Sequence, residues 1–100
     1  MSNGLIPLNY AILQHFEDID EACASDVIEA LKPLYSGYHM FKQESVEEVL
    51  MTSVVNGLLD KSRRDLDENG KLRVYYKIND YGRDMVDKYI GQYRNPAKKA

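Results

Sequence analysis

Apolar residues near the start of the chain recur at the three- and four-residue spacing of an α-helix. Pro7 stands where the first turn of a helix tolerates proline, and the apolar positions after it are Leu8, Ala11, Ile12, Phe16 and Ile19. The acidic stretch 17–21 then predicts a connector. The pattern therefore predicts a first helix that follows Pro7 and leads into this connector.

A second helical pattern follows the connector. Its apolar positions are Val27, Ile28, Ala30, Leu31 and Leu34. Asp26 and Glu29 are placed to form a capping pair at its start, and Pro33 is expected near its end or at a kink. Ser36 and Gly37 predict a turn, after which the short aromatic stretch 38–41 predicts a minimal strand.

A third helix is predicted from Ser45, because Ser45 and Glu48 have the spacing of a capping box. Its buried stripe is expected to comprise Val46, Val49, Leu50, Ser53 and Val54. Gly57 is placed to end the helix in the left-handed conformation, which glycine adopts at little cost.

The pattern then changes to the two-residue alternation of β-strands. Segments 58–67 and 71–79 are predicted to pair, joined by a type I′ turn at Asn69 and Gly70. In the second strand the inward positions are predicted to be Leu72, Val74, Tyr76 and Ile78.

A last helix is predicted from a cap at Asp80 to a stop at Asn95 and Pro96. Its apolar stripe is Tyr81, Met85, Tyr89, Ile90 and Tyr93. This stripe is long for so small a domain, and aromatic residues favour subunit interfaces. We therefore interpret these five residues as a homodimer interface; the alternative is that they pack on the first helix within a monomer.

The chain has 100 residues, of which 44% are hydrophobic and 29% charged, so it is interpreted as one domain, 1–95, with a frayed tail at 96–100. No apolar run reaches the ~18 residues of a membrane span, and no basic residue precedes the apolar residues of 1–16 as in a secretory signal. Cys23 is the single cysteine, which fits a reducing compartment. These features predict a cytoplasmic protein with no membrane partner.

The net charge of −3 conceals an asymmetry between the two halves. Segment 17–48 holds nine acids against two bases, whereas segment 60–100 holds eleven bases against seven acids. Positive charge is therefore concentrated in the C-terminal half, where it leaves room for a local basic patch.

The order of helix, helix, short strand, helix, hairpin and helix is that of a winged helix, an α+β and mostly helical fold. Two stretches sharpen the comparison: Val-Val-Asn-Gly-Leu-Leu at 54–59 and Arg-Val-Tyr-Tyr-Lys-Ile-Asn-Asp-Tyr-Gly-Arg at 73–83. They resemble the PadR-like family of bacterial winged-helix regulators, over about 8–92 of this chain. The chain departs from that pattern at Asn79, where the family usually has threonine, and in the acids of its third helix, Glu44, Glu47 and Glu48.

We expect a small DNA-binding transcriptional regulator that works as a dimer and represses by occluding a promoter, with the third helix at the major groove and the hairpin on the flanking backbone. The candidate contacts at the third helix are Lys42, Gln43, Thr52, Ser53 and Asn56. Those on the hairpin are Lys61, Arg63, Arg64, Lys71, Arg73 and Lys77. The alternative interpretation is that Glu47 and Glu48 form a solvated face, that Ser53 packs, and that the hairpin acids neutralise its bases.

Catalysis gains no support from the sequence. His15 and His39 have no spaced partners for a metal or a nucleophile, and no glycine-rich phosphate loop is present, so we expect neither an enzyme nor a cofactor. A small-molecule effector stays open, since some PadR-like proteins resemble drug sensors with an aromatic pore at the dimer interface. The alternative function is a winged-helix protein interaction module that binds no DNA and uses its acidic surface.

Overall fold

The computed structural model describes residues 7–39 and 41–90. In this part of the chain, four α-helices and a two-stranded antiparallel hairpin form an α+β fold, an arrangement compatible with the winged-helix prediction. The elements are α1 (Leu8–Phe16), α2 (Ala24–Tyr35), α3 (Gln43–Val55), β1 (Leu59–Leu66), β2 (Leu72–Ile78) and α4 (Asp80–Met85), which continues as a π-helical turn, η1 (Val86–Ile90).

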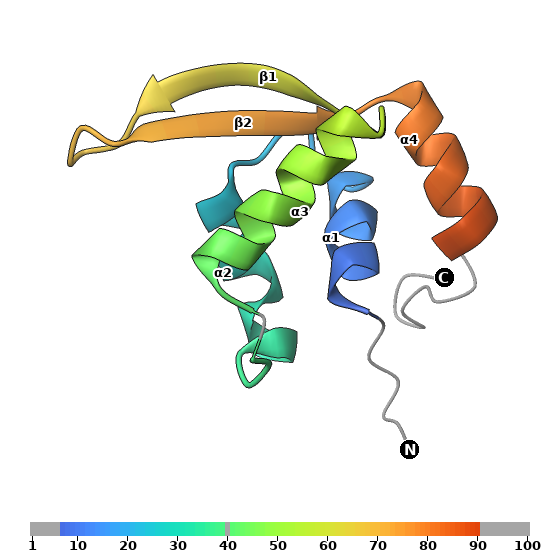
Figure 1. The fold of residues 1–100 in the computed structure, drawn as a ribbon, viewed down its shortest axis with the longest axis horizontal. Coiled ribbons are helices and arrows are strands. Elements are labelled where there is room, and N and C mark those ends of the chain that lie inside the picture. The colour runs from blue at the N-terminus through green and yellow to red at the C-terminus, as the bar shows by residue number, and fades with distance from the viewer. Residues whose placement is uncertain (1–6, 40, 91–100) are drawn as a thin grey trace.

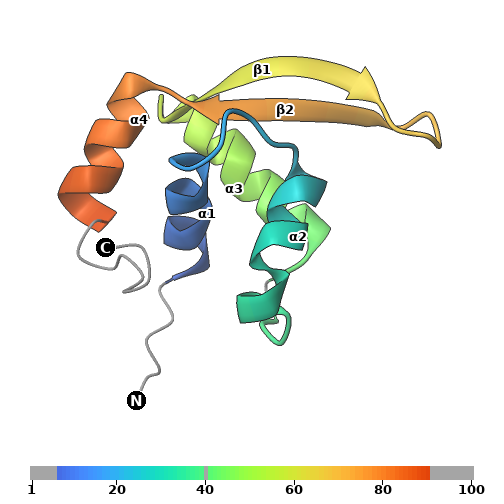
Figure 2. The same cartoon turned by 180° about the vertical axis from the view of Figure 1, so that it is seen from behind.

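The helices gather on one side of the hairpin, and the hairpin tip projects past them (Figure 1). Helix α4 lies beside α1, on the side away from α2, as the view from behind also shows (Figure 2). Where the helices meet the base of the hairpin they enclose one core, whose most fully buried side chains are Ile12, Phe16, Val27, Tyr35, Val46, Leu50, Leu59 and Val86. The inward stripes predicted for the first three helices therefore supply most of this core.

Helix α2 begins earlier than the sequence suggested. Cys23 is its N-cap residue, and its backbone N–H donates to Asp26 Oδ2 at 3.2 Å. Asp26 therefore stands at the third helical position, where its carboxylate accepts a hydrogen bond from the N-cap residue, so the predicted pairing of Asp26 with Glu29 is wrong. Pro33 lies in the last turn, as expected, where it ends the helix within two residues.

The short strand predicted at 38–41 does not form at the three described positions, 38, 39 and 41. Tyr38 and Phe41 instead close turns and pack against the ring of Tyr35, at centroid distances of 5.0 and 6.2 Å. An isolated β-bridge to the hairpin forms instead at Ala22, which precedes α2. There the N–H and C=O of Ala22 exchange hydrogen bonds with Tyr76 at 3.0 and 2.9 Å.

Helix α3 also begins early, at Gln43, with Lys42 as its N-cap residue. Ser45 is inside the first turn, so the predicted capping box at Ser45 is wrong. The end of α3 agrees with the prediction: Gly57 has a φ of 82°, and the N–H of Leu58 reaches back to the carbonyl of Ser53 at 2.9 Å. This pattern closes the helix and turns the chain into β1.

The strands pair with Leu59 opposite Ile78 and Leu66 opposite Leu72, and a bulge at Ser62 shifts the register. The connection differs from the predicted type I′ turn, because Gly70 alone in it has a positive φ, of 80°. Gly70 N–H donates to the Asp67 carbonyl at 2.9 Å, and Asp67 N–H to that of Lys71 at 2.8 Å. The loop therefore has three residues, 68–70: a type I turn followed by a glycine bulge.

Helix α4 is capped by Asn79, one residue before the predicted cap at Asp80. Asn79 Oδ1 accepts a hydrogen bond from the N–H of Gly82 at 2.7 Å. The predicted stop at Asn95 and Pro96 and the tail 96–100 lie outside the described residues. No helix in the described part of the chain combines the length and the apolar character that a membrane crossing requires.

Candidate functional site

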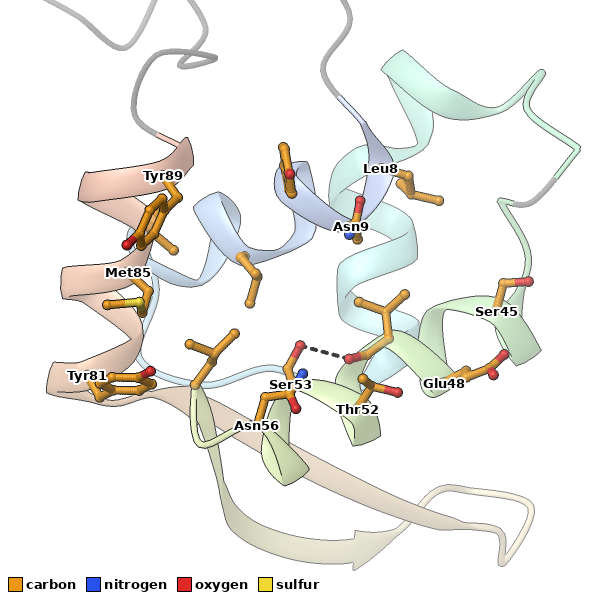
Figure 3. A pocket seen from close by; sticks show the side chains of 15 residues that line it. Leu8, Asn9, Ser45, Glu48, Thr52, Ser53, Asn56, Tyr81, Met85 and Tyr89 are labelled. Atoms are coloured by element: carbon orange, nitrogen blue, oxygen red, sulfur yellow. Dashed lines mark hydrogen bonds between the residues drawn. The ribbon is translucent and has the colours of Figure 1, made fainter.

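Helix α3 has one buried side and one exposed side. Val46, Leu50 and Ser53 face the core, and the exposed fraction of Ser53 is only 5%. The Ser53 hydroxyl donates to the carbonyl of Val49 at 2.8 Å (Figure 3). Ser53 therefore has neither the exposure nor a free donor to reach a nucleic-acid base, and its interpretation as a DNA contact is wrong.

The other third-helix candidates, Lys42, Gln43, Thr52 and Asn56, are exposed. Three carboxylates, Glu44, Glu47 and Glu48, are exposed on the same helix. Gln43 donates its side-chain amide to Glu47 at 2.9 Å. The exposed side of α3 is therefore acidic, and it repels a phosphate backbone.

The outer side of the hairpin carries a network of paired charges. Residues directly opposite in an antiparallel pair share a side, so Arg63 stands over Tyr75 and Asp65 beside Arg73. Arg73 donates two hydrogen bonds to Asp65, from Nε to Oδ1 at 2.8 Å and from Nη2 to Oδ2 at 3.1 Å. Arg63 binds Glu21 of the α1–α2 connector at 2.7 Å, and its guanidinium carbon lies 3.9 Å from the centre of the Tyr75 ring.

These contacts alter the protonation equilibria of the carboxylates. Donation by the Ser62 hydroxyl, and then by Arg63, lowers the pKa of Glu21, while the Arg73 guanidinium lowers the pKa of Asp65. The same pairs raise the pKa of Arg63 and that of Arg73. Two of the six hairpin bases named as DNA contacts are thus held by carboxylates of the same chain.

The other four hairpin bases, Lys61, Arg64, Lys71 and Lys77, are exposed and form no ion pair with any described residue. Lys71 stands at the loop, and Arg64 is opposite Val74 on the core-facing side of the hairpin. The tip of the hairpin projects past the helices (Figure 1). The exposure of these four side chains leaves them accessible to a binding partner.

A groove of about 670 Å³ runs between α1, α3 and α4. From α4 and its continuation η1 it is lined by Tyr81, Met85 and Tyr89, which follow one another along the chain (Figure 3). Tyr81 and Tyr89 are exposed and Met85 is half-buried, so three of the five residues predicted at a dimer interface share an open apolar surface. The side chain of Ile90 and the whole of Tyr93 lie outside what the structure describes.

The remaining candidate residues have structural surroundings. Cys23 is buried, and His15 lies edge-on to the ring of Phe16 at a centroid distance of 6.3 Å. His39 is exposed. Within residues 7–39 and 41–90, no three His, Cys, Asp or Glu side chains come together as metal ligands do.

Sequence reasoning missed Glu21 and Tyr75, which fix the outer side of the hairpin. Tyr75 stands on the opposite side of its strand from the predicted stripe, and it is buried because Arg63 covers it. Glu21 lies 42 residues before Arg63, and no local pattern relates the two. Asp65 is one of the hairpin acids that the alternative interpretation expected to neutralise the bases, and its hydrogen bonds to Arg73 agree with that interpretation.

Neither a scan against protein-family models nor a search of curated proteins found a match to this chain.

Proposed function

We propose that the chain is a small winged-helix protein that binds double-stranded DNA as a homodimer and represses transcription by occluding a promoter. The observation that carries this proposal is a set of four exposed bases on the hairpin that form no ion pair with any described residue: Lys61, Arg64, Lys71 and Lys77. Cations free of carboxylates can replace the counterions of a phosphate backbone, which is the main source of affinity for duplex DNA. The resemblance of 54–59 and 73–83 to PadR-like regulators supports it.

In this proposal the hairpin is the wing, and its basic residues have two roles. Arg63 and Arg73, already bound to Glu21 and Asp65, hold the wing in shape. Lys61 and Arg64 reach phosphates. The glutamates of α3 keep the exposed side of that helix off the backbone, so the wing supplies most of the affinity.

Fluorescence anisotropy with a labelled duplex tests the proposal. The duplex comes from upstream of the protein's own coding sequence, with a random duplex of equal length beside it. Over a series from about 50 to 200 mM salt, Arg64→Ala and Lys61→Ala should each weaken binding to both duplexes and reduce the log–log salt slope by about 1. Lys32→Ala on α2, also a single lost cation, is the matched control and should leave the slope unchanged.

Two results would end the DNA proposal. One is the absence of binding to either duplex at the lowest salt. The other is an equal loss of affinity in the Lys32→Ala control, which would trace the effect to net charge and not to the wing.

A protein interaction module that binds no DNA is the second candidate function. It is favoured by one observation, the exposed acidic side of α3 formed by Glu44, Glu47 and Glu48. The two candidates separate in the same titration, since such a module shows no duplex binding at modest ionic strength.

A further inference from the structure

The exposed side of α3 is apolar as well as acidic. Met51 and Val55, four residues apart, are neighbours on the helix surface, with exposed fractions of 57% and 83%. Together with Thr52 and the three glutamates, they line one shallow hollow. We call this surface, formed by Glu44, Glu47, Glu48, Met51, Thr52 and Val55, the α3 outer face.

The apolar part of the α3 outer face continues onto the hairpin. Met51 also lines a second groove, where it is joined by Leu72 of β2. Leu72 is directly opposite Leu66 in the strand register, and the exposed fractions of the two leucines are 58% and 63%. Four large apolar side chains are therefore left in water on neighbouring elements, a pattern typical of a surface that another molecule covers.

The charges around these residues define what that molecule carries. Glu44, Glu47 and Glu48 form no ion pair with any described residue, and the nearest polar contact on this face is the amide of Gln43 on Glu47. A nucleic acid would bring phosphates against three carboxylates. A segment with Lys or Arg beside an apolar stripe would neutralise the carboxylates and cover Met51 and Val55 at once.

We propose that the α3 outer face is a docking site for a basic amphipathic helix of a partner protein. Helix α3 has 13 residues, so a partner helix laid along it would be in contact over about 20 Å, or three to four turns. Its apolar side packs on Met51, Val55 and Leu72, and its cations pair with the glutamates. This docking site is separate from the wing bases, so the proposal stands whether or not the wing binds DNA.

The probe for this site is a fluorescein-labelled synthetic peptide of about 18 residues with a leucine stripe flanked by lysines, long enough for a bound helix of the required length. Two control peptides keep its length: one has glutamate in place of lysine, the other serine in place of leucine. Anisotropy should show saturable binding of the lysine–leucine peptide to the full chain, and much weaker binding of both controls.

Variants of the protein assign the binding to this face. Met51→Gln with Val55→Thr should weaken peptide binding at least about tenfold, because two apolar contacts are lost. Glu44→Gln with Glu48→Gln should weaken it by roughly threefold to tenfold at low salt, and the difference should shrink at high salt. Leu34→Gln and Glu29→Gln, which change an exposed leucine and an exposed glutamate on α2, are the matched controls and should bind as the wild type does.

All five altered positions on α3, at 44, 47, 48, 51 and 55, are exposed, and circular dichroism checks that each variant is folded before it is titrated. Three results would overturn the proposal. The first is an absence of saturable peptide binding, and the second is equal binding by the α3 variants and the α2 controls. The third is tighter duplex binding by Glu47→Gln than by Glu29→Gln, which removes the same charge from α2; that difference would place DNA on the α3 outer face. Loss of wing binding to DNA alone leaves the docking proposal intact.

Discussion

At the scale of single residues, Asn79 joins three elements through one side chain. Its Oδ1 caps α4, and its Nδ2 donates to the carbonyl of Gly57 at 2.9 Å and to Asp60 Oδ1 at 3.2 Å. A threonine, the usual residue at this place in the PadR-like pattern, can cap a helix but has a single hydroxyl hydrogen to donate. The asparagine therefore ties the end of α3 and the start of β1 to the first turn of α4.

Gly82 is required by a close approach of two segments. A Cβ built on it would meet the carbonyl of Leu58 and would lie 2.8 Å from Ile78 Cγ1. Because a carbonyl in the backbone cannot move aside cheaply, we expect Gly82→Ala to lower the free energy of unfolding by about 1–3 kcal/mol.

Urea denaturation measures the effect of Gly82→Ala, with Gly37→Ala as its control. Nothing lies within 4 Å of a Cβ added at Gly37, so that variant should be at least as stable as the wild type. A Gly82→Ala protein as stable as the Gly37→Ala one would mean that α4 does not approach Leu58 this closely.

At the scale of elements, the hairpin loop offers a test of its turn type. Gly70 has a φ of 80°, while Asn69, like every described residue other than glycine, has no positive φ. Gly70→Ala should therefore cost about 1 kcal/mol or more of unfolding free energy, and Asn69→Ala should cost much less. Thermal or urea unfolding distinguishes the two, because a type I′ turn would make both substitutions costly.

The ion-pair network on the outer side of the hairpin predicts a loss of stability in acid. The pKa of Glu21 and that of Asp65 are lowered in the folded protein, so their contribution is complete above their unfolded values near 4 and is lost as the pH falls through the folded values. We expect the free energy of unfolding to fall between about pH 5 and pH 2, and to fall less steeply in Asp65→Asn.

Urea denaturation at a series of pH values checks this prediction. Asp65→Asn should be less stable than the wild type at neutral pH, and the two should converge in acid. Parallel pH profiles would show that the pairing of Asp65 with Arg73 contributes nothing to folding.

At the scale of the whole molecule, the open groove between α1, α3 and α4 bears on oligomeric state. Tyr81 and Tyr89 are exposed on its α4 side, and a second copy packed there would cover both. We expect the wild type to sediment as a dimer at tens of micromolar, and Tyr81→Glu with Tyr89→Glu to sediment as a monomer with unchanged helical content.

Sedimentation velocity and circular dichroism, applied to the same samples, test this prediction. Leu34→Glu introduces the same charge at an exposed apolar position of α2 and should remain dimeric. If the wild type sediments with the mass of one chain, the two tyrosines are ordinary exposed residues and the proposed function no longer includes a homodimer.

The sequence by itself determined the order of the helices and the hairpin, and most of the core. Val46, Leu50 and Ser53 are buried as their spacing predicted, and Gly57 ends α3, because periodicity and glycine's freedom act within a few residues. Helix starts were displaced by one to three residues. Cys23, Lys42 and Asn79 occupy the N-cap positions in place of Asp26, Ser45 and Asp80. Lys42 makes no side-chain cap hydrogen bond, so the packing of α3 and not a capping side chain sets where that helix begins.

Only the tertiary structure decided which basic side chains are left without a carboxylate partner among the described residues, and which residue forms a β-bridge to Tyr76. Strand pairing brings Asp65 to Arg73, as the alternative interpretation expected of the hairpin acids, but only the folding of the whole chain brings Glu21 within hydrogen-bonding distance of Arg63. Tyr76 pairs with Ala22, whereas the described residues of the aromatic stretch, 38, 39 and 41, form no strand. The contacts of Glu21 with Arg63 and of Ala22 with Tyr76 join residues distant along the chain, and the packing of whole elements sets these partners, which no local pattern encodes.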